Sequence, residues 1–190
     1  MEPVSNFIWR PWEEPGSEHL RIHRAPSGEM IADSQLVTVI DGAVLRLSYR
    51  VELDANWRTL SVRVACEQPN GTAIGLALQS DGAGNWRDGS GLALPELGGC
   101  LDIDIQATPF TNTLPIRRLN LAAEESEVIR VVYIPVPTLD VAPMKQQYTG
   151  IDDRHVRYES IRSGFTRELE IDRDGFVVQY PGLFRRIWPI

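Results

Sequence analysis

Five Asx-Gly pairs divide the chain into short segments in which apolar and polar residues alternate. Such pairs accept positive φ and suit the tight turns that join antiparallel strands. Residues 45–53 show the alternation well, because every second side chain is apolar and the side chains between them are mostly polar. Period-two alternation indicates half-buried strands rather than helices. The pairs are Asp41-Gly42, Asn70-Gly71, Asp81-Gly82, Asp88-Gly89 and Asp174-Gly175.

The order of these segments predicts one mainly antiparallel sheet. Segments 45–53, 60–66 and 73–79 follow one another through short links, as in a meander of consecutive strands. The best helix candidate is 112–123, which Pro115 limits to a short helix or an irregular turn. About ten strands in one sheet must curl, split or close to hide an apolar face. With no linker or repeat in its 190 residues, the chain is expected to form a single domain, residues 1–190.

Composition excludes several classes of protein. The net charge of −7 argues against a general nucleic-acid binder, which needs a basic surface. The two cysteines, Cys66 and Cys100, are too few for a secreted disulfide framework, and Cys66 lies in an alternating apolar pattern that predicts a buried side chain. No stretch resembles a signal peptide or approaches the roughly 20 apolar residues of a membrane span. We therefore expect a cytoplasmic protein with no nucleic-acid partner and no integral membrane segment.

Two carboxylates on one predicted strand raise the question of catalysis. Asp102 and Asp104 are two residues apart, so their side chains share a face about 7 Å apart at a rise of ~3.3 Å per residue. Paired carboxylates at such a spacing serve as acid and base in glycoside hydrolysis. The alternative is a polar strand face that pairs with Arg46, Arg50 or Arg63.

The sequence predicts neither a metal site nor a cofactor. His19 and His23 are four residues apart, but the segment between them alternates like a strand, and no Cys or carboxylate motif completes a ligand set. His155 is isolated, and Lys145 is the only lysine in the chain. Neither a nucleophile elbow nor a phosphate-binding glycine loop is present.

Two tryptophans are candidate ligand contacts. Trp57 and Trp86 lie at strand ends or in loops, and the surroundings of Trp86 are polar and glycine-rich. An indole in such a place stacks on a sugar ring or covers an apolar chain. The alternative is that it plugs the end of the core.

Segment 107–119 is the most unusual part of the chain, because it is dense in hydroxyl groups and ends in paired arginines. Arg117 and Arg118 are candidates to present forked donors to an anionic head group. Asn112 is a candidate to bind ligand hydroxyls or to cap a short helix. The alternative is a structural corner in which one arginine pairs with Asp102 or Asp104.

This segment and several others resemble the bacterial "putative glycolipid-binding" family. The resemblance implies a strongly curved, mostly antiparallel sheet that forms an incomplete barrel, similar to periplasmic carriers of lipoproteins and to mycobacterial lipid-carrying lipoproteins. Those carriers are exported, whereas no signal peptide is recognised here. The matching stretches are 98–104, 108–119, Tyr49 with Asp54 and Trp57, 82–86, 147–148, 172–175 and 180–184.

The sequence therefore favours a binding protein for a glycolipid or another amphiphile, held in the cavity of a curved sheet, with no catalysis expected. Two alternatives stay open: a structural or interaction homodimer joined through sheet edges, and a carbohydrate- or ester-directed hydrolase that uses Asp102 and Asp104. The candidate ligand contacts are Trp57, Trp86, Asn112, Arg117, Arg118 and Tyr148.

Overall fold

A computed structural model of the chain describes residues 4–189, which form strands almost throughout. Their elements, in chain order, are β1 (Ser5–Pro11), β2 (Gly16–Arg24), β3 (Met30–Ile40), β4 (Ala43–Leu53), β5 (Thr59–Glu67), β6 (Ala73–Ser80), β7 (Trp86–Asp88), the 3-10 helix η1 (Pro95–Leu97), β8 (Asp102–Ile105), α1 (Phe110–Leu119), β9 (Ser126–Ile134), β10 (Ala142–Asp152), β11 (His155–Ser160), β12 (Phe165–Ile171), β13 (Val177–Tyr180) and β14 (Phe184–Trp188).

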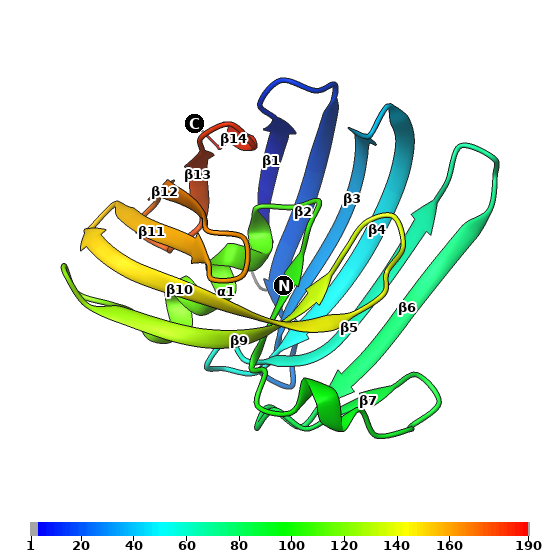
Figure 1. The fold of residues 1–190 in the computed structure, drawn as a ribbon, viewed down its shortest axis with the longest axis horizontal. Coiled ribbons are helices and arrows are strands. Elements are labelled where there is room, and N and C mark those ends of the chain that lie inside the picture. Colours follow the sequence, from blue (N-terminus) through cyan, green and yellow to red (C-terminus); the bar gives the residue numbers. More distant parts are fainter. Residues whose placement is uncertain (1–3, 190) are drawn as a thin grey trace.

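The strands of the described residues form one 14-stranded sheet made of two meanders. The first runs from β1 outward to β7, and the second runs from β9 to β14. Strands β1 and β14 pair antiparallel and so join the two meanders near the middle of the sheet. Strand β8 pairs with the outer edge of β9, and this is the one parallel pairing between the described strands. Strands β9–β12 run across the direction of β2–β6, and α1 lies between the two groups (Figure 1).

Local sequence rules explain the strands and turns of the first meander. The alternating apolar residues of β4 are all buried, from Leu45 to Leu53. The turn between β3 and β4 consists of Asp41 and Gly42, whose φ angles are 50° and 76°. Positive φ at both central residues matches the twist of paired antiparallel strands. The predicted meander over 45–79 is therefore confirmed.

Two expectations about the sheet need correction. It contains 14 strands rather than about ten, because strands such as β7, β13 and β14 are too short to show a clear alternation. The strong curl into an incomplete barrel is also not supported: the sheet stays open, with β7 and β8 as unpaired edges among the described strands. The apolar faces are covered instead by α1 and by packing of β8 and β9 against the first meander.

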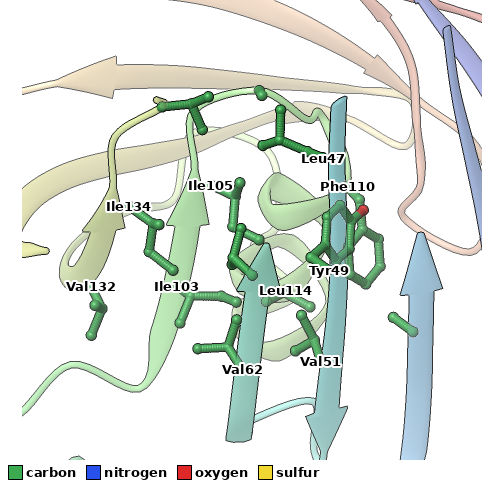
Figure 2. Packing of buried hydrophobic residues seen from close by; sticks show 14 of the residues in the cluster. Leu47, Tyr49, Val51, Val62, Ile103, Ile105, Phe110, Leu114, Val132 and Ile134 are labelled. Atoms are coloured by element: carbon green, nitrogen blue, oxygen red, sulfur yellow. The ribbon is translucent and has the colours of Figure 1, made fainter. Parts of the chain in front are cut away.

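The main core lies between the two meanders. Ile103 and Ile105 of β8 and Val132 and Ile134 of β9 belong to the same buried cluster as the inward side chains of β4 and β5. Figure 2 shows these side chains meeting around Leu114 of α1. A second cluster lies within β9–β13 and takes in the end of α1. Helix α1 thus contacts both cores.

Helix α1 begins and ends earlier than predicted. It covers Phe110–Leu119 rather than 112–123 and contains Pro115. The Thr108 hydroxyl accepts the Phe110 N–H at 3.0 Å, and Asn120 adopts the left-handed conformation that ends helices. No helix within residues 4–189 has the length and apolar character needed to cross a membrane. Cys66 is buried, as predicted.

Candidate functional site

A cavity of about 490 Å³ opens on the second meander, next to the start of α1. Its wall is largely aromatic, its floor is polar, and its mouth is formed by the β11–β12 and β13–β14 turns. The residues that line it are Asp104, Gln106, Thr108, Asn112, Tyr133, Met144, Tyr158, Ser160, Arg162, Ser163, Phe165, Tyr180, Leu183 and Phe184.

The aromatic wall comes from three adjacent hairpin strands and β14. Tyr158 packs 6.3 Å from Phe165 and 6.2 Å from Tyr180, measured between ring centroids. Tyr180 in turn packs 6.3 Å from Phe184. Most of these rings meet edge to face, which is a favourable arrangement for aromatic pairs. The wall is therefore a packed aromatic layer that presents apolar surface to the cavity.

Asp104 lies at the polar floor and keeps part of its surface open to the cavity. The side-chain amide of Gln146 donates a hydrogen bond to Asp104 Oδ2 at 2.5 Å. Burial raises the pKa of Asp104 to about 6, although hydrogen bonds from Gln146 and Thr111 act in the opposite direction. Burial outweighs these two bonds because a carboxylate loses more hydration than two neutral donors return.

Two of the predicted site residues meet beside this floor. The Tyr148 hydroxyl donates to Asn112 Oδ1 at 3.0 Å. Asn112 lines the cavity, whereas Tyr148 is buried behind it and does not line it. The structure therefore brings Asn112 and Tyr148 together and places only Asn112 where it can touch a ligand.

A second buried carboxyl lies on the other side of the start of α1. Glu18 Oε1 accepts hydrogen bonds from Tyr49 at 2.5 Å and from Ser34 at 2.8 Å. The Tyr49 hydroxyl also lies 3.3 Å from the hydroxyl of Thr108, which lines the cavity. Burial raises the pKa of Glu18, and these hydroxyl groups partly offset that rise. This cluster fixes the segment that leads into α1.

Trp57 and Arg117 meet away from the cavity. The Arg117 guanidinium carbon lies 4.1 Å from the Trp57 ring centroid, a cation–π contact. Arg117 also donates to the main-chain carbonyl of Asp174. Arg117 lines a separate hollow of about 380 Å³ that Asp172 and Asp174 make acidic. This pair therefore links α1 to the β4–β5 and β12–β13 turns.

Trp86 and Arg118 form contacts inside the protein rather than with the cavity. Trp86 is buried, and its indole N–H donates to the Cys100 carbonyl at 2.8 Å. Arg118 forms an ion pair with the buried Asp102, whose Oδ2 lies 2.6 Å from Arg118 Nη2. The six predicted contacts thus do not form a single site.

The Asp102–Arg118 ion pair matches the structural alternative for segment 107–119. Arg46 and Arg50, which were suggested as partners of Asp102 and Asp104, bind other carboxylates. Arg46 pairs with Glu67, and Arg50 pairs with Asp33 and Glu52. Asp102 and Asp104 also do not face the same cavity, because only Asp104 lines it. The two-carboxylate arrangement considered for hydrolysis is therefore not formed.

Sequence reasoning missed the aromatic wall. A signal was present, because aromatic residues recur within the last third of the chain, at Tyr158, Phe165, Tyr180 and Phe184. These four rings line one cavity only because their strands pair with one another, and no local sequence pattern specifies that pairing. Within residues 4–189 no group of three or more His, Cys, Asp or Glu side chains is arranged to hold a metal ion.

The fold and cavity define an open, mainly antiparallel β protein with an aromatic-walled pocket beside one short helix. The chain belongs to the family described as "Putative glycolipid-binding", whose model matches residues 6–186. The resemblance noted in the sequence is therefore confirmed. Among curated proteins, none matches the chain.

Two solved structures are similar to this chain. One is the crystal structure of a DUF1089 family protein from Pseudomonas aeruginosa, with 41% identity, coverage of 93% of this chain and 95% of that chain, and a TM-score of 0.85. The other is a beta-barrel-like protein of the domain of unknown function DUF1849 from Brucella abortus, with 12% identity, coverage of 98% and 95%, and a TM-score of 0.56. The second likeness concerns the fold alone.

Proposed function

We propose that the chain is a binding protein for a small amphiphilic molecule, with a glycolipid as the example that its family description suggests. The observation that carries this proposal is the cavity of about 490 Å³ with an aromatic wall and a polar floor. Pockets of roughly 300–1,000 Å³ that are mainly apolar, with a few convergent polar groups, are typical of small-molecule sites.

The arrangement suits a ligand with two unlike parts. The rings of Tyr158, Phe165 and Phe184 offer apolar surface to a hydrocarbon chain or to the C–H face of a sugar. Asp104 and Asn112 offer hydrogen-bonding groups to a polar head. Binding is favoured over hydrolysis because Asp102, the suggested second carboxylate, is held by Arg118 outside the cavity.

Native mass spectrometry of freshly purified protein tests the proposal. We expect an added mass that corresponds to a retained amphiphile, or uptake of one from a series of alkyl glucosides. Ser160→Trp fills the cavity from β11 and is expected to abolish this added mass. Thr166→Trp, at an exposed position on the neighbouring strand, is the matched control and is expected to retain it.

Circular dichroism shows whether both variants are folded. A wild-type protein that retains no amphiphile and takes up no added alkyl amphiphile contradicts the proposal. Equal uptake by a folded Ser160→Trp variant contradicts the assignment to this cavity.

A further inference from the structure

Asp104 is a half-buried carboxyl that no cationic side chain neutralises. Within the described residues it forms no salt bridge, and its hydrogen-bond partners, Gln146 and Thr111, are neutral. Asp102, two residues earlier on β8, differs in this respect because Arg118 closes over it. A buried charge without a partner is costly, so proteins normally pair it or bind a counterion there. The unpaired carboxyl faces the cavity rather than the packed interior.

The charge of Asp104 acts on four tyrosine phenols. Burial raises the pKa of each of these phenols, and the charge of Asp104 raises it further. Three of them line the same cavity as Asp104, together with two phenylalanines. The four phenols are Tyr133 of β9, Tyr148 of β10, Tyr158 of β11 and Tyr180 of β13.

The positive charges near the cavity stand at its mouth. Arg162, in the β11–β12 turn, lines the cavity but is exposed. Arg167 is also exposed, and its guanidinium carbon lies 4.5 Å from the ring centroid of Phe165. Solvent and salt screen such charges far more than they screen a buried one. The field at the floor is therefore set by Asp104.

We propose that the cavity takes an amphiphile whose head carries an organic cation, a protonated or quaternary amine, with the ammonium group against Asp104 and the apolar part along the aromatic wall. This inference rests on the function proposed above and specifies the ligand class of the same cavity. An anionic partner neutralises the cation, and the negative faces of aromatic rings attract it, as in the aromatic cages that recognise quaternary ammonium groups. A phosphate head is opposed by the same carboxylate.

Calorimetric titration with three amphiphiles of equal chain length tests the ligand class. Octyltrimethylammonium, octyl glucoside and octyl phosphate, each kept below its micellar concentration at neutral pH, differ in the charge of the head. We expect the ammonium compound to bind at least about tenfold more tightly than the other two, which corresponds to the strength of a desolvated cation–π and ion-pair contact.

Asp104→Asn keeps the size of the side chain and removes its charge. We expect it to weaken binding of octyltrimethylammonium at least about tenfold and to weaken binding of octyl glucoside by a smaller factor, because a neutral head loses a hydrogen bond to Asp104 but no ion pair. Asp153→Asn, which changes an exposed carboxylate away from this cavity, is the control for net charge and is expected to bind all three probes like wild type.

Three outcomes overturn the inference. If octyl glucoside or octyl phosphate binds as tightly as the ammonium compound, or if Asp104→Asn binds the ammonium compound like wild type, the cation assignment fails while the binding function stands. If none of the three amphiphiles binds, the binding function itself fails and the assignment fails with it.

Discussion

Replacing Asp104 by Asn should make the stability of this protein less dependent on pH. Burial raises the pKa of Asp104 in the folded state from 3.8 to about 6. The folded protein therefore holds a proton that the unfolded chain has released between these two values. It follows that the free energy of unfolding falls as the pH rises from about 4 to about 6 and then levels off. Asn has no proton to release, so this contribution disappears in the variant.

The size of the effect follows from the two pKa values. A rise from 3.8 to about 6 corresponds to about 3 kcal/mol, at about 1.4 kcal/mol for each pKa unit. Because Asp104 partly faces a cavity open to water, we expect about 1 to 3 kcal/mol.

Urea denaturation at about pH 4 and about pH 7 measures this quantity in wild type and Asp104→Asn. Between these two values the free energy of unfolding of wild type should fall by about 1 to 3 kcal/mol more than that of the variant. Glu18 contributes with the same sign but is present in both proteins, so it cancels in the comparison. Equal pH dependence of the two proteins, or a steeper fall in the variant, refutes the reasoning.

Two further predictions concern contacts of α1. Arg118→Met leaves Asp102 as a buried carboxylate without its partner, so the free energy of unfolding in urea should fall by about 3–5 kcal/mol at neutral pH; a loss under about 1 kcal/mol contradicts a buried ion pair. Trp57→Leu keeps an apolar side chain but removes the ring beneath the Arg117 guanidinium, so we expect a loss of about 1 kcal/mol in the same assay. Because the Trp57 ring also packs against Phe176, this loss should become smaller, but should not vanish, when Arg117 is already Met.

Local chemistry was sufficient to predict much of the first meander. The Asx-Gly pairs and the alternation of residues 45–53 predict turns and half-buried strands without any long-range information, because φ preference and side-chain period are properties of neighbouring residues. Strand β4, whose inward side chains from Leu45 to Leu53 are all buried, bears this out. The short helix was also recognisable, although its start was not, since a hydroxyl before the helix rather than a residue at 112 sets it.

The pairing of β1 with β14 was beyond such reasoning. These strands lie at opposite ends of the sequence, and their contact joins the two meanders into one sheet. The aromatic cavity depends on the same kind of information, because Tyr133 of β9 and Phe184 of β14 line one space although they are 51 positions apart. Period-two patterns state which side chains share a face of one strand, but not which strands become neighbours.

Segment 107–119 explains why the candidate contacts were only partly right. Asn112, Arg117 and Arg118 were candidate ligand contacts, with a structural corner as the alternative, and both arginines form contacts within the protein. Thr108 contacts Tyr49 in the first meander, and Arg118 pairs with Asp102 of β8. Polar side chains buried between two layers need partners within the protein, so a segment rich in them is as typical of a helix wedged into a sheet as of a binding loop. Asn112 and Thr108 differ from the arginines because both line the cavity, and the bond from Tyr148 uses the carbonyl oxygen of Asn112. The helix thus contributes to the site mainly by fixing the wall against which Asp104 and the tyrosine rings are arranged.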